Sequence, residues 1–187
     1  IIENNRNISL ELKEIKFKFD IKDLDLFLET RNPKLIYRDI VIPIKYTKVY
    51  LDFTSLIKSK PKIEKINILS KEINIDQLKK IILKTKPSSL NSLIRNKVKN
   101  GKLVVNLELY LNDNLHIDNF IAKGEVKEIN GTITNDLILK NTSFNFFADS
   151  SDILIKNLKS KMDGLLIKNG NLQIKKNKEI SLKSDFT

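Results

Sequence analysis

Residues 103–111 alternate strictly along the chain, and this pattern limits the possible folds more than any other feature. Apolar side chains occupy every second position, and they are Leu103, Val105, Leu107, Leu109 and Leu111. A spacing of two residues places them on one face of a β-strand, whereas a helix would need a spacing near 3.6. At about 3.3 Å per residue, nine residues span roughly 30 Å. The pattern therefore predicts a long strand with one apolar face.

The same alternation recurs over most of the chain. Further apolar runs are Ile8, Leu10 and Leu12; Ile15, Phe17 and Phe19; Leu24, Leu26 and Leu28; Ile40, Ile42 and Ile44; Val49, Leu51 and Phe53; Phe144 and Phe146; Ile153 and Ile155; Leu165 and Ile167; Leu172 and Ile174; and Ile180 and Leu182. The phase slips by one residue at Lys13–Glu14, which predicts a β-bulge there. Asn130–Gly131 and Asn169–Gly170 suit two-residue type I′ hairpins, and Asp163–Gly164 is a third candidate.

One region has helical spacing instead. We expect Asp76 to cap a short helix running to about Thr85, and Ser88 or Ser89 to cap a second helix that ends before Gly101. Helices do not alternate with strands, which argues against a parallel α/β sheet. The expected fold is mainly β: a long antiparallel, curved sheet shaped like a groove. Residues 1–187 would form one section of a longer protein, with a short helical insertion at 76–100.

The charge is the next constraint. Lys and Arg number 34 against 23 Asp and Glu, a formal net charge of +11, but only four of the cations are Arg. Arg is the preferred residue for bidentate phosphate contacts. The aromatic residues fall mostly on the apolar alternation rather than among the cations, so we expect no nucleic-acid partner. Lysine clusters at 58–65 and 175–178 suit either anionic lipid head groups or solubility and protection of sheet edges.

Residues suited to catalysis or metal binding are scarce. There is no Cys, and His116 is the single His, so a metal site at Asp113, His116 and Asp118 is a weaker interpretation than a polar turn. The acidic segment at 20–25 lacks the Gly and terminal Glu of a calcium loop. Three Asn-X-Ser/Thr triplets, at Asn7, Asn130 and Asn141, are expected by chance in an Asn-rich chain. We expect no enzymatic activity, no cofactor and no metal.

The apolar stripe leaves two alternatives open. Two sheets could cover one another in a closed sandwich that serves as a scaffold or adaptor, or a single sheet could be covered by lipid. The long aliphatic strands, the lack of Trp and a chain that begins and stops within the strand pattern favour the open groove. The residues expected to line such a groove are Ile8, Leu10, Leu12, Leu103, Val105, Leu107, Leu109, Leu111, Phe144 and Phe146.

Two segments resemble a known family. Residues 50–57 (YLDFTSLI) and 58–68 (KSKPKIEKINI) follow a strand, a D-hydrophobic-x-S-L turn, a Lys-rich step and an x-I-x-x-I-x-I run, and then EINID and a short helix. The tail, with ILIKNL at 153–158, GLLI at 164–167 and NGNLQI at 169–174, has the same rhythm. The pattern resembles the AsmA-like proteins, which include the TamB and YhdP relatives, over about residues 24–182.

The resemblance implies a function. It suggests a bacterial envelope protein, anchored in the inner membrane and facing the periplasm, whose repeating β-groove conducts phospholipid between the inner and outer membranes. Phospholipid acyl chains and membranes would then be its partners, together with envelope proteins whose identity the resemblance does not give. The family has no catalytic residues to carry over, and its N-terminal transmembrane helix has no counterpart in this sequence. The alternative is a non-catalytic adaptor domain in envelope assembly that binds protein partners.

Overall fold

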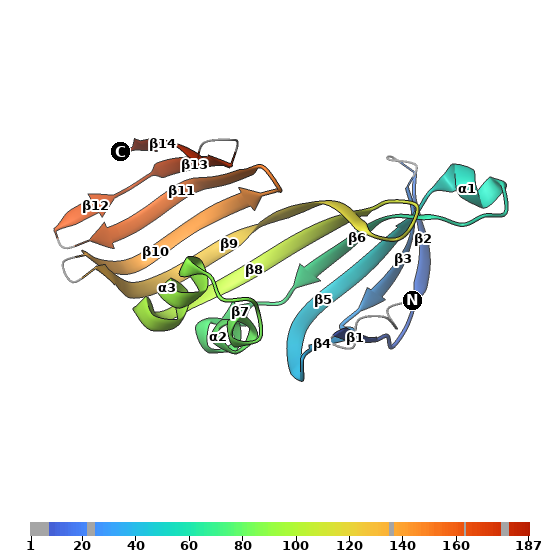
Figure 1. The fold of residues 1–187 in the computed structure, drawn as a ribbon, viewed down its shortest axis with the longest axis horizontal. Coiled ribbons are helices and arrows are strands. Elements are labelled where there is room, and N and C mark those ends of the chain that lie inside the picture. Colours follow the sequence, from blue (N-terminus) through green and yellow to red (C-terminus); the bar gives the residue numbers. More distant parts are fainter. Residues whose placement is uncertain (1–7, 22–24, 135–136, 163, 177–179) are drawn as a thin grey trace. The chain divides into compact units, whose positions relative to one another are not determined.

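The computed structural model describes residues 8–21, 25–134, 137–162, 164–176 and 180–187. They form one large antiparallel sheet that is not closed, with three short helices (Figure 1), which confirms the predicted fold class. The strands are β1 (Ile8–Glu11), β2 (Lys16–Asp20), β3 (Asp25–Arg31), β4 (Lys34–Tyr37), β5 (Ile40–Leu51), β6 (Ile63–Ser70), β7 (Ile73–Asn74), β8 (Val98–Leu111), β9 (Ile117–Thr134), β10 (Leu137–Ala148), β11 (Asp152–Met162), β12 (Leu165–Ile167), β13 (Gly170–Lys176) and β14 (Ile180–Phe186). The helices are α1 (Phe53–Ile57), α2 (Ile75–Leu83) and α3 (Ser89–Lys97).

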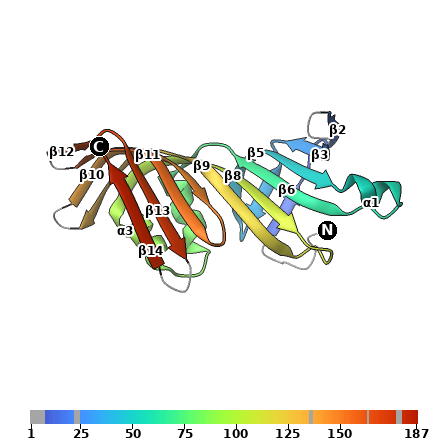
Figure 2. The ribbon, with the colours of Figure 1, turned by 90° about the horizontal axis from the view of Figure 1, so that it is seen from above.

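The strands follow the order β1-β4-β5-β6-β8-β9-β10-β11-β13-β14, with β2-β3 added beside β5, β7 beside β8 and β12 beside β11. The chain divides into two compact units. Unit 1 comprises Ile1–Lys71 and Val105–Ala122, and unit 2 comprises Glu72–Val104 and Lys123–Thr187. In unit 2, strands β11, β13 and β14 lie side by side (Figure 2). Each unit is described separately below.

A β-bulge in β5 keeps the apolar side chains of unit 1 on one face. Ile44 lies opposite Ser70 of β6, but Tyr46 lies opposite Leu69, so Lys45 is an extra residue in β5. Such an extra residue restores the face after a one-residue slip in the apolar pattern. Ile42 and Ile44 therefore share a face with the later apolar residues of β5.

The prediction of a β-bulge at Lys13–Glu14 is wrong. The two apolar runs on either side of it belong to separate strands, because β1 pairs with β4 and β2 pairs with β3.

The structure also has a hairpin between β4 and β5 that the sequence pattern did not reveal. Its two turn residues, Arg38 and Asp39, both have positive φ (46° and 71°), which a type I′ turn requires. Arg is an uncommon residue in that position, so the pattern gave no signal.

Only one of the three glycine hairpins forms. Asn130–Gly131 lies inside β9, where a Cβ on Gly131 would collide with the backbone carbonyl of Lys97. Gly131 therefore serves a close backbone approach and not a turn. Asn169 does not have positive φ, and Gly170 begins β13. Gly164 does have positive φ, and it lies in the two-residue connection of the hairpin in which Met162 pairs with Leu165.

The predicted pair of helices is confirmed, but one cap was wrong. The cap of α2 is Asn74, not Asp76: its side-chain oxygen accepts from the Gln77 N–H at 2.9 Å, and the Gln77 side chain accepts from the Asn74 N–H at 3.2 Å. This reciprocal arrangement is a capping box. Ser88 caps α3 as expected. Phe53, expected to end a strand, instead begins α1, which Asp52 caps.

The buried apolar core is small for a chain of this length. Among the described residues, it consists of Leu26, Phe27, Ile44, Ile73, Ile75, Ile82 and Val98. The accessible surface is 12984 Å², whereas a globular protein of this mass exposes about 9,200 Å² and two half-size globules about 11,000 Å² in total. Much of the apolar alternation is therefore left in contact with solvent.

Candidate functional site

The candidate site is an apolar face of the sheet in unit 1. Residues directly opposite one another in antiparallel strands share a face, so the registers define it. One row crosses five strands, from Phe17 through Leu28, Val49 and Ile66 to Leu109. Its neighbours on either side complete what we call the apolar face: Phe17, Phe19, Leu26, Leu28, Val49, Leu51, Ile66, Ile68, Leu107 and Leu109.

This face is partly open to solvent, most of all on β2. Leu26 is buried, but the side chains on β5, β6 and β8 are only half-buried, and Phe17 on β2 is 63% exposed. The described strands form one sheet that is not closed. The closed-sandwich alternative is therefore not the architecture of this chain.

The predicted lining residues fall into two groups. Val105, Leu107, Leu109 and Leu111 alternate along β8 in unit 1, and all are half-buried. Leu10 is opposite Leu35 of β4, which is opposite Ile42, so Leu10 lies on the same face of the sheet as Ile44. The backbone of Ile8 lies opposite Tyr37 in the same ladder. Leu12 lies beyond the end of β1 and is exposed, so it does not belong to this face.

The other predicted lining residues belong to unit 2. Leu103 pairs with Ile73 of β7. Phe146 lies opposite Ile155, which lies opposite Leu172, so these three share a second apolar face on β10, β11 and β13. Ala148, Ile153, Ile174 and Leu182 form the next row of that face. The two-residue alternation in the sequence predicts this apolar face in unit 2, as it predicts the apolar face of unit 1.

Glycine allows the ring of Phe146 to approach the neighbouring strand closely. A Cβ added to Gly124 of β9 would come within 2.9 Å of the Phe146 ring carbons. The ring therefore occupies space that any other residue at position 124 would fill. The sequence alone gave no indication of this contact.

The opposite face of unit 1 is polar, and it corrects our view of the aromatic residues. Phe27, Tyr50 and Tyr110 lie on this face beside lysines rather than on the apolar alternation. The Lys48 ammonium lies 4.5 Å from the centroid of the Phe27 ring, and the Lys65 ammonium lies 4.2 Å from that of Tyr50. These cation–π contacts satisfy the cations within the sheet.

A buried carboxylate anchors the polar face. Glu29 is 6% exposed, and its Oε1 accepts from Lys18 Nζ at 2.8 Å and from Arg31 Nε at 3.0 Å. The hydrogen bond from Lys18 is the main reason that the pKa of Glu29 is below its ordinary value. Burial raises the pKa of Tyr50 to about 12, so that phenol stays neutral at physiological pH. Acidic and basic groups balance one another here, which leaves little net attraction for a polyanion.

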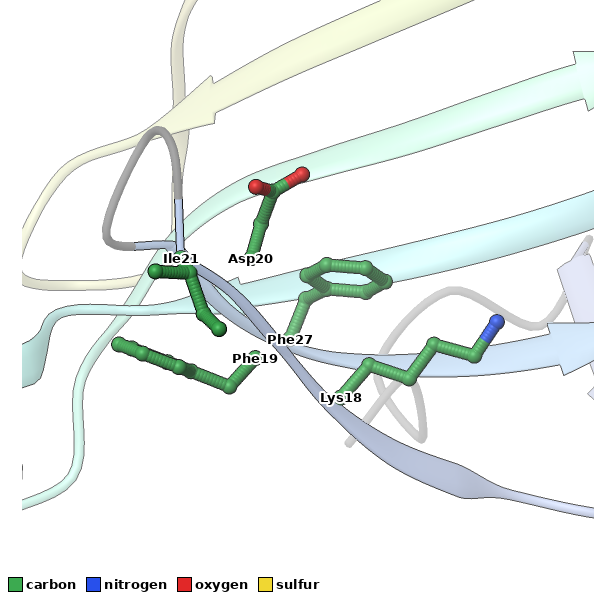
Figure 3. Close-up of a pocket in the computed structure, with 5 residues that line it drawn as sticks. All are labelled: Lys18, Phe19, Asp20, Ile21 and Phe27. Carbon is green, nitrogen blue, oxygen red and sulfur yellow. The ribbon is translucent and has the colours of Figure 1, made fainter.

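A shallow hollow of about 490 Å³ lies at the end of β2. It is lined by Lys18, Phe19, Asp20, Ile21 and Phe27, and in Figure 3 Phe19 and Ile21 point away from Asp20 and Phe27. The hollow thus lies at the edge where the two faces meet. The Lys18 ammonium in its lining is held by Glu29, and we assign no chemistry to the hollow.

The turn around His116 is a structural turn. The Asn112 side chain accepts from the backbone N–H groups of Asn114 and His116, each at 3.0 Å. Asp113 pairs with Lys62, and this contact raises the pKa of the Lys62 ammonium. Within the ranges that the structure describes, three or more His, Cys, Asp or Glu side chains are nowhere grouped to hold a metal ion. Asp23, from the acidic segment, lies outside the described residues.

Comparison with protein families, with characterised proteins and with solved structures found no match for this chain. The resemblance to the AsmA-like proteins therefore rests on the sequence motifs alone and stays a prediction. Among the described helices, none has both the length and the apolar character needed to span a membrane.

Proposed function

We propose that the chain binds phospholipid acyl chains along the apolar face of unit 1, as a section of a non-enzymatic protein that conveys lipid between membranes. The observation that carries this proposal is the row from Phe17 to Leu109, which is apolar across five strands and has no fully buried member. Monomeric proteins seldom expose a continuous apolar patch of this kind unless it binds something.

The energetics suit reversible transport. The row spans about 19 Å at a strand spacing of about 4.8 Å. Each buried CH₂ group contributes about 0.8 kcal/mol, so half-covering roughly 15 carbons yields about 6 kcal/mol. Binding of that strength retains an acyl chain without trapping it. It also requires only apolar side chains in register, which agrees with the scarcity of catalytic groups. A location in the periplasm, between inner and outer membranes, is supported by the family resemblance alone.

A second candidate is an adaptor that binds protein partners through sheet edges. The observation that favours it is the position of β2, which pairs only with β3 among the described strands and carries exposed Phe17 and Phe19. Edge strands of this kind accept an added strand from a partner. Against it, lysines at positions 16 and 18 are residues that protect edges from pairing.

Photocrosslinking tests the proposal directly. A phospholipid with a diazirine in its acyl chain should crosslink to the native protein, and Leu107→Asp and Leu109→Asp should each abolish the product. Asn145→Asp is the matched control, because it adds the same charge at an exposed position on the face opposite Phe146. It should crosslink like the native protein.

Two further measurements keep the result interpretable. Far-ultraviolet circular dichroism should show unchanged β content in both Asp variants, and Leu109→Ser serves as a milder change if either unfolds. Mass spectrometry of the purified protein should detect copurifying phospholipid. Equal crosslinking by native and Leu109→Asp proteins, or no lipid at all, would count against acyl-chain binding and favour the adaptor.

A further inference from the structure

Exposed apolar side chains gather at one end of the sheet in unit 1. Phe19 lies opposite Leu26, which lies opposite Leu51 at the end of β5, and α1 follows directly. Phe19 and Phe53 of α1 are in contact, with ring centroids 6.5 Å apart. The ion pair between Lys62 and Asp113 joins the same end to the β8–β9 turn. The exposed large apolar residues of this end are Phe19, Ile21, Phe53, Ile57, Leu115 and Ile117.

Helix α1 extends beyond the ends of β5 and β6 (Figure 1). The Asp52 carboxylate begins the helix by accepting from the Thr54 N–H at 2.8 Å. Phe53 and Ile57 are four residues apart and so share one side of the helix, where they are 52% and 71% exposed. The tip thus presents two bulky apolar side chains to solvent, with only Phe19 among the described rings packed against them.

The segment that contains α1 is rich in lysine. Residues 53–62 include Lys58, Lys60 and Lys62 and no acidic residue. Lys62 is occupied by Asp113, whereas no ion pair of the described residues involves Lys58 or Lys60, which are both exposed. The acidic residues nearest the tip are already engaged, since Asp52 caps α1 and Asp113 pairs with Lys62, and Asp20 lies on β2. An anionic surface would therefore attract the tip more strongly than the strand ends.

We propose that the α1 tip, formed by Phe53, Ile57, Lys58 and Lys60, docks on the surface of an anionic lipid bilayer. The apolar pair would enter the boundary between head groups and acyl chains, and the two ammonium groups would remain among the phosphates. The inference rests on the proposed function for its purpose, because a lipid carrier must meet a membrane. Its test is independent of acyl-chain binding on the apolar face.

The first test uses a fluorescent reporter. The chain contains no Trp, so Ile57→Trp introduces a single indole at the tip. Its emission should shift to the blue when vesicles of equimolar phosphatidylcholine and phosphatidylglycerol are added, and not with phosphatidylcholine alone. Leu166→Trp, at a similarly exposed position on β12 in unit 2, is the matched control and should not shift. An unshifted tip or an equal shift in the control would overturn the proposal.

The second test measures affinity by co-sedimentation with the same anionic vesicles. Each lysine near an anionic surface accounts for about a five-fold change in affinity, so the K58A/K60A double variant should bind about 25-fold more weakly. K159A/K161A removes the same charge from β11 and should bind like the native protein. Raised salt should weaken native binding. Full binding by K58A/K60A would refute docking by this tip.

The outcomes also separate the two proposals. If Leu107→Asp still sediments with vesicles but no longer crosslinks to acyl chains, docking and acyl-chain binding are distinct properties, as we propose. If the tip docks but the native protein never crosslinks to lipid, the proposed function fails and docking stands. If the native protein ignores vesicles and instead forms a dimer that Ile57→Ser abolishes, the tip is an interface between copies, and the docking proposal is wrong.

Discussion

Ile66 of β6 lies directly opposite Leu109 of β8 on the apolar face, and both side chains are only half-buried. Side chains in such a pair approach to about 5 Å and cover one another laterally. The described strands belong to one sheet that is not closed. Their remaining apolar area is available to a ligand. A substitution at either position should therefore weaken ligand binding more than it weakens the fold.

We therefore expect Leu109→Ala to cost about 1–2 kcal/mol of unfolding free energy, less than a fully buried leucine, because part of the side chain is solvated in the native state. Leu26→Ala, at a buried position of the same face, should cost about 3 kcal/mol. Chemical denaturation measures both values, and lipid crosslinking should fall in Leu109→Ala despite its near-native stability. A loss of 3 kcal/mol or more in Leu109→Ala would indicate a covered core at this position.

Two buried threonines permit a second prediction, because the change from Thr to Val should stabilise the protein at one of them and destabilise it at the other. The Thr30 hydroxyl is buried and has no hydrogen-bond partner among the described residues. The Thr142 hydroxyl is also buried and lies 2.6 Å from that of Ser160. Thr30→Val removes an unsatisfied group and should stabilise the protein by about 1 kcal/mol. Thr142→Val leaves the Ser160 hydroxyl unpaired and should cost about 1–3 kcal/mol.

The Thr142 result can be checked within its own pair. Ser160→Ala should also be destabilising, whereas the double variant T142V/S160A should recover much of the loss, since no polar group is then left unpaired. Thermal or chemical unfolding of the four proteins completes the cycle. Strictly additive losses would show that the two hydroxyls do not depend on one another.

Glu29 predicts how stability responds to acid. Its pKa in the folded protein is below the ordinary value of 4.5, chiefly through the hydrogen bond from Lys18. The unfolded chain therefore binds a proton more readily than the native protein does, so the stabilisation is complete above pH 4.5. It is lost as the pH falls from 4.5 through the lower pKa of the folded state.

Glu29→Gln isolates this effect. At neutral pH it should lower the unfolding free energy by about 1–3 kcal/mol, because two charge-assisted hydrogen bonds are weakened. The difference from the native protein should shrink below pH 4.5. Asp118→Asn, which changes an exposed carboxylate on β9, controls for the loss of one negative charge. A difference that stays constant through the acid range would contradict the assignment.

The sequence predicted much of the β-sheet because one apolar face per strand leaves a direct two-residue signature. Val105 to Leu111 lie on one strand, as their alternation indicates, and Phe146 shares its face with Ile155. The strand order could not be predicted, since alternation does not state which strands pair. The solvent exposure of the apolar faces could not be predicted either, because a covered face and an open one have the same sequence pattern.

The errors have physical causes. Asn130–Gly131 has the composition of a hairpin turn, but Gly131 is required where β9 approaches the backbone of Lys97. The lysines beside Phe27 and Tyr50 appeared to be a solvated surface, but cross-strand register brings them over the rings. Contacts between residues far apart in the chain decided both cases, and local spacing does not contain them.

The cap of α2 permits a last prediction. Asn74 and Asp76 are both good capping residues by type, and they are separated by two positions. In the structure, Asn74 forms a capping box with Gln77, and Asp76 lies in the first turn as an exposed acid. Asn74→Ala should therefore cost about 1 kcal/mol, because the Gln77 N–H loses its acceptor. Asp76→Ala should cost about 0.5 kcal/mol or less, since it removes only a favourable interaction with the helix dipole.

Chemical denaturation of both variants, at low and at raised salt, distinguishes the two contributions. The loss in Asp76→Ala should diminish with salt, because it is a long-range charge effect that ions screen. The loss in Asn74→Ala should persist, because it comes from a neutral hydrogen bond. A greater loss in Asp76→Ala than in Asn74→Ala would place the start of the helix at Asp76 after all. That outcome would also displace Ile75, one of the few buried apolar residues of unit 2, from the first turn of α2.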